Sequence, residues 1–233
     1  MHFSTIVSAL LTASVSFASP TPTEKRATSC SPVGISAQSS ARVVSAFKSS
    51  KIVAELIPSI SPKVAVSAAY GSKQVDLGNK FKTTGSLFQL FIHRRQAHNI
   101  AETLLAPTVS FSGEKDKDAA TTKYSYFLID PDVPSPDGVA GMKVTFLHLA
   151  VSNAQPSCIK NQSPSTDAIY QPLTPASTTQ HRYTFLVYRQ PSGYTPDTVA
   201  FQVRAAFDIN AYAARKGLVL VGGNFLREAI TNL

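Results

Sequence analysis

The chain has 233 residues, of which 43% are hydrophobic and 15% are charged, so it carries enough apolar side chains for a folded core and is not a typical disordered chain. Its 22 lysines and arginines against 14 aspartates and glutamates give a formal net charge of +8, which favours phosphate-bearing partners. Basic residues are not interleaved with aromatic residues in a dense stripe, and we therefore expect no nucleic-acid partner.

The N-terminus is typical of a secretory leader. Residues 6–17 form an apolar run that is too short to span a membrane. Ser16 and Ala18 occupy the small-residue positions of a signal cleavage site, which predicts a signal peptide over residues 1–18. We therefore expect a secreted protein, in the medium, the cell wall or a vacuole.

Residues 19–26 form a Pro/Thr-rich stretch that ends in Lys25-Arg26 and resembles a dibasic processing site. Cleavage there would leave residues 27–233, which we expect to fold as one domain. The alternative is an uncut, flexible leader.

The two cysteines, Cys30 and Cys158, allow only one intramolecular pairing. Because a secreted protein folds in an oxidising compartment, we expect them to form a disulfide that ties the mature N-terminus to the middle of the chain. The alternative is two buried free thiols. Neither cysteine has a CxxC neighbour, so redox chemistry is not indicated.

Two short helices are expected first along the chain. Ser39 or Ser40 is placed to cap a helix that carries Val43 and Phe47 on one face. A second helical run begins near Ile52 and must stop before Pro58.

Strand-like alternation of apolar residues begins at Lys63 and recurs along the chain. The stretches expected to form strands are 64–70, a strand beginning at Val109, 124–129, 144–152, 182–188 and 218–221. Residues 81–92 are ambiguous. Several short strands with small peripheral helices indicate a single, mostly-β domain.

Two stretches between the strands have no regular pattern. Glu114 to Asp118 alternates acidic and basic residues and is interpreted as a solvated loop, not a binding patch. Residues 158–179 are rich in Ser, Thr, Pro and Gln, and loops of this length are usually functional or disordered.

One helix is expected close to the C-terminus. Asp208 is placed to cap it, with Phe207 and Tyr212 as a hydrophobic staple. Gly217 stands where such a helix ends.

Polar groups follow or occupy three of the predicted strands. Asp130-Pro131-Asp132 follows a buried strand, where the prolines at 131 and 134 make the backbone rigid. His148 is expected on the face of Phe146 and Ala150. His181 and Tyr183 share a face with Phe185 and Val187. Such a histidine is usually a core residue, but two of them beside a rigid carboxylate pair predict a small polar pocket in an apolar wall.

Three uses of this group of residues remain open. Two histidines and an aspartate suit a metal, although the spacing matches no familiar metal motif. A histidine with an aspartate can activate a nucleophile, but no GxSxG elbow or catalytic-type cysteine is present. Alternatively, imidazole N–H groups and the Tyr183 hydroxyl donate to an anion, while Asp130 orients a histidine or accepts from a ligand's ammonium group. Only the third use needs no residue or motif that the sequence lacks.

These residues resemble the phosphatidylethanolamine-binding protein family. The matching segments are Tyr-Phe-Leu-Ile-Asp-Pro-Asp-Val-Pro-Ser (126–135), Phe-Leu-His-Leu-Ala-Val-Ser-Asn (146–153), His-Arg-Tyr-Thr-Phe-Leu-Val-Tyr-Arg-Gln (181–190), Pro-Thr-Val-Ser-Phe (107–111) and a tail over 207–225. The likeness covers roughly residues 38 to 230 and suggests a secreted, fungal-type member.

The resemblance implies a β-sandwich with an anion pocket at one end and no enzymatic activity, and we expect no cofactor or metal. The positions that match the family's pocket are Asp130, Asp132, His148, Pro175, His181 and Tyr183. The family usually has a glycine-rich approach to the pocket histidine, whereas this chain has Pro-Ala-Ser-Thr-Thr-Gln over 175–180, which implies a stiffer and more polar rim. Phe146 and Leu147 replace the aromatic residue and histidine that often precede the other pocket histidine, which implies a narrower specificity.

The resulting hypotheses fall into three classes. The first is a non-enzymatic binding protein for phospholipid head groups, phosphate or phosphoethanolamine, with an anionic membrane surface as a further partner. The second is an inhibitor of a serine carboxypeptidase or another protease, because some fungal members of the family resemble such inhibitors. The third is a metal-dependent hydrolase. Asn161 begins a glycosylation sequon that the following Pro164 disfavours.

Overall fold

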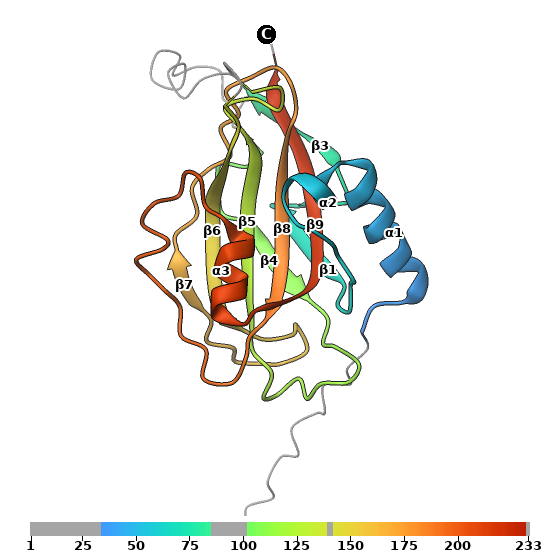
Figure 1. Cartoon of the computed structure of the whole chain (residues 1–233). Helices are drawn as coiled ribbons and strands as arrows, with labels where there is room; N and C mark the ends of the chain where they lie inside the picture. The colour runs from blue at the N-terminus through green and yellow to red at the C-terminus, as the bar shows by residue number, and fades with distance from the viewer. Residues whose placement is uncertain (1–33, 85–101, 139–141, 232–233) are drawn as a thin grey trace, which may run out of the picture.

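The computed structural model describes residues 34–84, 102–138 and 142–231. Its strands are β1 (Val66–Tyr70), β2 (Lys73–Gln74), β3 (Asn79–Thr84), β4 (Thr108–Phe111), β5 (Tyr124–Val133), β6 (Val144–Ala154), β7 (Ser165–Ala168), β8 (His181–Arg189) and β9 (Val219–Thr231). Its helices are α1 (Ala37–Ser49), α2 (Ile52–Glu55) and α3 (Ile209–Lys216). The sequence-based expectation of a mostly-β fold with a helix near the C-terminus is confirmed (Figure 1).

The strands form two sheets. The larger has the order β3-β9-β8-β5-β6-β7, and the smaller has the order β2-β1-β4. β3 runs parallel to β9, whereas the other paired strands are antiparallel. β5 and β8 are therefore central strands with a hydrogen-bonded neighbour on each side.

Both faces of the central strands are buried, which makes the fold three layers deep. Leu128 of β5 and Phe185 of β8 pack against the small sheet, together with Ala68 and Tyr70 of β1. On the opposite face, Phe127, Ile129 and Leu186 pack against α1 and α3. This double burial explains why β5 is almost continuously apolar in sequence instead of alternating.

The helices begin and end largely where local sequence signals place them. α1 is capped by Ser36, not by Ser39 or Ser40, and the Ser36 side chain accepts from the Ser39 N–H at 3.1 Å. The expected second helix is a single distorted turn, since Val53 and Ala54 have non-helical backbone angles.

The C-terminal helix follows its predicted signals closely. The Asp208 side chain accepts from the backbone N–H groups of Asn210 and Ala211. Gly217 ends the helix in the left-handed region at φ 64°. The rings of Phe207 and Tyr212 lie 5.6 Å apart, as a hydrophobic staple requires.

The last strand is longer than the expected stretch 218–221, because β9 continues to Thr231. A Gly-Gly pair commonly marks a turn, but Gly222 and Gly223 lie inside this strand. A Cβ added at Gly222 would lie 2.6 Å from Val64 Cγ2, and one at Gly223 would lie 2.7 Å from Phe47 Cζ. Glycine therefore serves close packing at these two positions, not chain reversal.

The expectation that residues 114–118 form a solvated loop needs a correction. Glu114 is fully buried, with its carboxylate 2.6 Å from Arg189 Nη1 and 3.9 Å from Lys63 Nζ. The Tyr124 hydroxyl also donates to it at 3.3 Å. The run is therefore not wholly a solvated loop, because its first residue is a core ion-pair partner.

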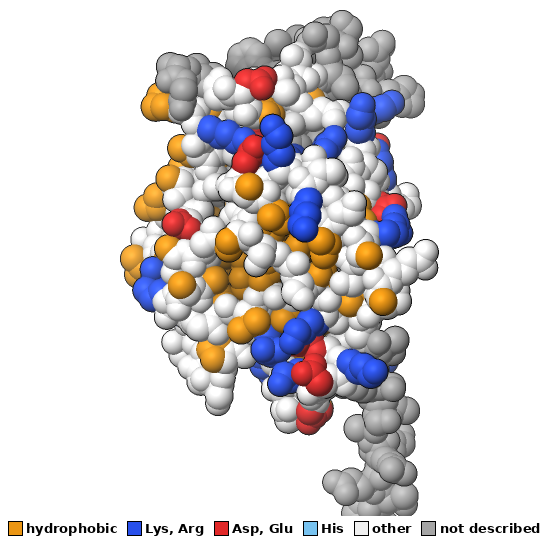
Figure 2. Space-filling model, turned by 45° about the vertical axis from the view of Figure 1, so that its right-hand side comes forward, with side chains coloured by type: hydrophobic (Ala, Val, Ile, Leu, Met, Phe, Trp, Pro, Cys, Tyr) orange, Lys and Arg blue, Asp and Glu red, His pale blue; other side chains and the backbone are white. Residues whose placement is uncertain are grey.

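Charges elsewhere on the surface are mixed. On the face shown in Figure 2, lysine and arginine side chains lie towards the two ends, with acidic side chains among them and apolar side chains between. Within the described part of the chain, no helix is both long and apolar enough to cross a membrane. The signal peptide, Ala18, Lys25-Arg26 and Cys30 lie outside the described residues, so their predictions, including the pairing of Cys30 with Cys158, remain predictions.

Glu114→Ala should destabilise the fold by about 1–3 kcal/mol, because it leaves the half-buried Arg189 guanidinium without its carboxylate. Asp116→Ala is the matched control, since Asp116 is exposed in the same run, and it should change stability by less than about 0.5 kcal/mol. Urea unfolding of the two variants beside the unchanged protein measures both. Equal stability losses would show that Glu114 is no more than a surface charge.

Candidate functional site

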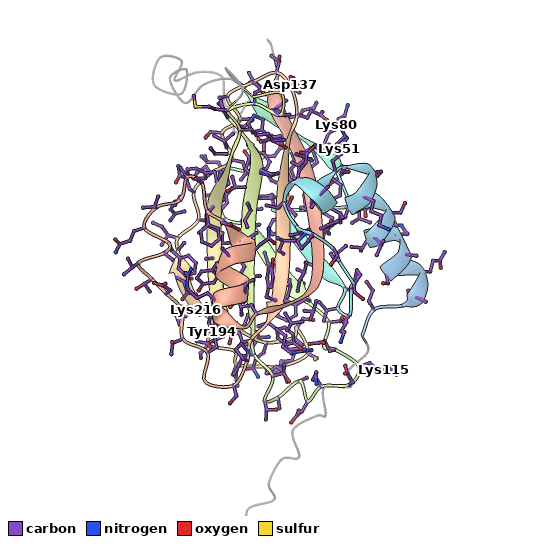
Figure 3. All side chains as sticks on the ribbon, in the orientation of Figure 1. Lys51, Lys80, Lys115, Asp137, Tyr194 and Lys216 are labelled. Carbon is purple, nitrogen blue, oxygen red and sulfur yellow. The ribbon has the colours of Figure 1, made fainter. Side chains whose placement is uncertain are left out.

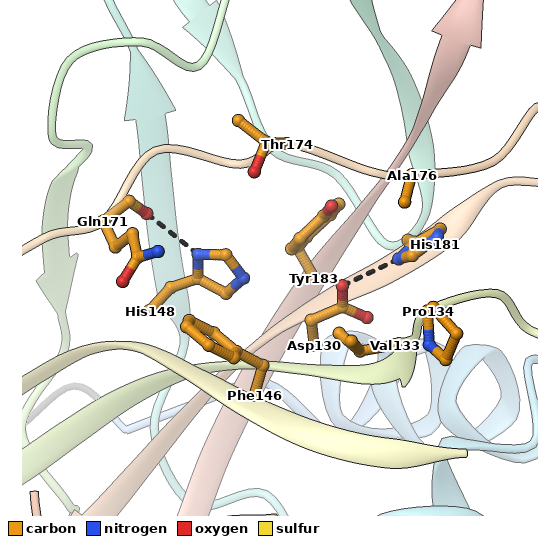
Figure 4. Close-up of a pocket in the computed structure, with 10 residues that line it drawn as sticks. All are labelled: Asp130, Val133, Pro134, Phe146, His148, Gln171, Thr174, Ala176, His181 and Tyr183. Carbon is orange, nitrogen blue, oxygen red and sulfur yellow. Dashed lines mark hydrogen bonds and ion pairs between the residues drawn. The ribbon is translucent and has the colours of Figure 1, made fainter. Parts of the chain in front are cut away.

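A cavity of about 160 Å³ opens where β5 ends and β6 and β8 begin. Figure 4 shows the side chains that line it. They are Asp130, Val133, Pro134, Phe146, His148, Gln171, Thr174, Ala176, His181 and Tyr183. The cavity is smaller than the roughly 300–1,000 Å³ of drug-sized sites, so it suits a small polar group.

The structure brings together four of the six pocket residues expected from the sequence: Asp130, His148, His181 and Tyr183. Asp130 comes from β5, His148 from β6, and His181 and Tyr183 from β8. All four are at most 5% exposed. Because β5 separates β6 from β8 in the sheet, these neighbouring strands place the four side chains around one opening.

A bulge in β6 aims His148 into the cavity. Leu128 pairs with Leu149 while Ile129 pairs with Leu147, so His148 is the extra residue between two registers. The expectation that His148 shares a face with Ala150 is therefore wrong, because Ala150 packs on the helix-covered side while the His148 ring lies 5.3 Å from the Tyr183 ring. Phe146 remains beside His148, with 4.9 Å between their ring centroids.

Asp130 and His181 form the buried polar pair of the pocket. Asp130 Oδ2 lies 2.8 Å from His181 Nδ1, and Asp130 Oδ1 accepts the Asp132 N–H at 2.8 Å. The His181 ring stacks on Tyr183 with an angle of 16° between the planes. Both Asp130 oxygens are thus engaged, which fixes the carboxylate and, through it, the imidazole.

His148 and Tyr183 complete the polar lining in their neutral forms. His148 Nδ1 lies 2.8 Å from the Gln171 carbonyl, which can only accept, so Nδ1 carries the hydrogen and Nε2 presents a lone pair towards Asp130 and Tyr183 (Figure 4). Burial lowers the pKa of His148, and the Arg204 charge acts in the same direction. Burial, with the Asp130 carboxylate nearby, raises the pKa of the Tyr183 hydroxyl, which therefore remains an O–H donor.

Two of the expected pocket residues do not line the cavity. Pro175 is buried between the lining residues Thr174 and Ala176 but is not itself at the surface of the cavity. Asp132 lies outside it, because its carboxylate accepts from the backbone N–H and from the Nε of Arg182, each at 2.8 Å. The two carboxylates of the Asp-Pro-Asp segment therefore have different partners.

Sequence reasoning missed the support around Asp132. Lys143 Nζ lies 2.9 Å from Asp132 Oδ1 and 2.8 Å from Glu55 Oε2. The Arg182 guanidinium also donates to the Ser50 carbonyl at 2.6 Å. Only the position of Arg182 next to His181 hints at this network, because the other partners are far apart in the chain.

Gln171 and Thr174 were also missed as pocket residues. Both lie in the stretch 158–179, which the sequence marks only as a long loop. Asn161 is exposed in the same stretch, with a left-handed backbone at φ 55°, and its glycosylation stays a prediction.

Comparison with known proteins agrees with the family resemblance noted in the sequence. The family model described as phosphatidylethanolamine-binding protein matches residues 71–225. A curated relative, the 26 kDa secreted antigen of Toxocara canis, is 31% identical over 190 residues, which cover 78% of this chain. The chain spans 62% of the length of that relative.

Solved structures share the fold. A carboxypeptidase Y inhibitor, solved in complex with its cognate proteinase, superposes with a TM-score of 0.61 at 19% identity, covering 82% of this chain and 97% of the inhibitor. The phosphatidylethanolamine-binding protein of Plasmodium vivax gives a TM-score of 0.56 at 20% identity, covering 81% and 97%. At these identities the likeness concerns the fold.

Asp132→Asn should destabilise the protein by about 1–3 kcal/mol near neutral pH, because the buried Arg182 guanidinium loses its buried carboxylate partner and keeps only the more exposed Glu55. Asp137→Asn is the control, since Asp137 is exposed at the same end of the molecule (Figure 3). Chemical denaturation of the two variants measures the difference.

The same substitution should change the acid limb of stability. Burial alone would raise the pKa of Asp132, but hydrogen bonds from Arg182 and Lys143 outweigh it and hold that pKa below its usual value. The ion pair therefore stabilises the fold above the unfolded pKa of about 4, and this stability is lost as the pH falls through the folded pKa. Asp132→Asn should lack this part of the acid-induced loss, and an unchanged acid limb would contradict the assignment.

Proposed function

We propose that this chain, which belongs to the phosphatidylethanolamine-binding protein family, is a non-enzymatic binding protein for small phosphate-bearing ligands. The observation that carries the proposal is the convergence of Asp130, His148, His181 and Tyr183 on one cavity of about 160 Å³. That volume suits a head group such as phosphoethanolamine.

The hydrogen-bonding pattern favours a ligand that carries both charges. The Tyr183 hydroxyl and the Nε2–H of His181 are donors for phosphate oxygens. Asp130 and the His148 Nε2 lone pair are acceptors for an ammonium group. A phosphate beside Asp130 is repelled unless a cation or a donor lies between them, and the ammonium group of phosphoethanolamine supplies that cation.

Among the residues that the structure describes, the cavity lining includes no lysine or arginine, and these residues therefore attract an anion through directed hydrogen bonds. We therefore expect phosphoethanolamine to bind more tightly than inorganic phosphate, because only the former has a partner for the acceptors.

The binding proposal is tested by calorimetric titration with phosphoethanolamine and inorganic phosphate. His181→Ala should weaken binding of phosphoethanolamine by about 10-fold or more, since it removes a donor and releases Asp130 from its partner. Lys80→Ala, which removes an exposed charge that does not line the cavity, is the control and should bind normally. Equal loss in both variants, or no binding by the unchanged protein, would contradict the proposal.

A second candidate is inhibition of a serine carboxypeptidase or another protease. It is supported by the shared fold with the carboxypeptidase Y inhibitor, which covers 97% of that inhibitor. The N-terminal residues before 34, which such inhibition can involve, lie outside the described part of the chain.

Titration of a serine carboxypeptidase with the processed protein separates this candidate from the first. An inhibitor should abolish peptidase activity near an equimolar ratio, and His181→Ala should inhibit equally well if the pocket takes no part. Full activity at saturating protein would remove the inhibitor candidate.

The third candidate, a metal-dependent hydrolase, has less support. Within residues 34–84, 102–138 and 142–231, no three His, Cys, Asp or Glu side chains are grouped so that they could hold a metal ion.

Secretion is supported by the relative whose name describes a secreted antigen, and by the leader-like N-terminal sequence. We propose a secreted protein, with the medium, the cell wall or a vacuole as its destination.

A further inference from the structure

The rim of the pocket places the Ser177 hydroxyl next to the His181 ring. The segment 174–180 follows β7 and passes over the opening, where Thr174 and Ala176 line the cavity. Its position is held by β9, because the Ile230 N–H donates to the Ser177 carbonyl at 3.0 Å. The Ser177 Oγ then lies 3.3 Å from His181 Nε2.

The direction of this contact follows from counting hydrogens. A serine hydroxyl has one hydrogen, and that of Ser177 is donated to the Thr179 carbonyl at 2.9 Å. With its hydrogen on the Thr179 carbonyl, Ser177 Oγ is placed to accept the Nε2–H of His181.

His181 consequently has both ring nitrogens occupied before any ligand arrives. Nδ1 is bonded to Asp130, and Nε2–H, the donor that a phosphate oxygen would use, is bonded to Ser177. The Ile230 N–H bonded to the Ser177 carbonyl, and the Thr179 carbonyl bonded to the Ser177 hydroxyl, keep this acceptor in place.

We propose that Ser177 is an affinity-determining residue of this pocket, whose hydroxyl competes with the ligand phosphate for the Nε2–H of His181. The inference rests on the proposed phosphate-binding function. An incoming phosphate must displace the hydroxyl, so this contact lowers the affinity for every ligand whose phosphate uses the Nε2–H.

Ser177→Ala removes the competing acceptor and keeps the backbone bond to Ile230. It should tighten binding of phosphoethanolamine and of inorganic phosphate by a similar factor of roughly 2- to 10-fold, the value of one hydrogen bond, because both ligands displace the same hydroxyl. Thr178→Ala is the matched control, because Thr178 is the exposed neighbour on the same segment, and its affinities should not change.

Calorimetry is paired with nitrogen NMR of the His181 imidazole, which reads the hydrogen bond directly. In the ligand-free protein, the Nε2 resonance should shift on Ser177→Ala and stay in place on Thr178→Ala. Thermal unfolding of each variant shows that the fold is retained.

The outcomes are distinguishable. If the unchanged protein binds phosphoethanolamine and Ser177→Ala binds equally or more weakly, the competition is refuted while the proposed function stands. If only Ser177→Ala binds, the competition is supported, while the proposed function of the unchanged protein fails. If neither binds, the proposed function fails and the inference fails with it.

Discussion

The end of β5 is the point on which the pocket and its surroundings depend. The regular pairing of β5 with β8 stops at Ile129 opposite Thr184, and the next residue but one is Pro131, which has no N–H to donate. Aspartate carboxylates replace the interrupted ladder. Asp132 accepts the Arg182 N–H, and Asp130 accepts the Asp132 N–H and holds His181. A single three-residue segment thereby fixes β8 on both faces of the sheet.

The Asp130-Pro131-Asp132 segment places a different group of polar side chains on each face of the sheet. Towards the helices, Asp132 joins a charged network with Arg182, Lys143 and Glu55, which is stable because each charge has a partner and most of the network is withdrawn from water. Towards the small sheet, Asp130 and His181 form a pair with an open side. The Asp132 N–H, which Asp130 accepts, joins the network on one face to the pair on the other.

The fold alone does not decide between a head-group-binding protein and a protease inhibitor, because neighbours with both descriptions superpose on this chain. What separates the candidates is the site. A small, open cavity with two acceptors and two donors is suited to a small zwitterion, whereas an inhibitor requires a complementary outer surface. The Ser177 hydroxyl adds a feature of this particular rim, since the segment 175–180 has no glycine and is held to β9.

The sequence by itself determined what depends on near neighbours: the mostly-β class, the C-terminal helix between Asp208 and Gly217, and four side chains of the cavity. Tertiary structure decided what depends on register and on distant partners. The bulge at His148 appears only when β6 is aligned with β5, because both registers are apolar. Asp132 and Glu114 are acidic residues in polar-looking stretches, and only the approach of Arg182 and Arg189 shows that they are buried in ion pairs. The contact of Ser177 with His181 likewise required the rim to fold back over the strand that follows it.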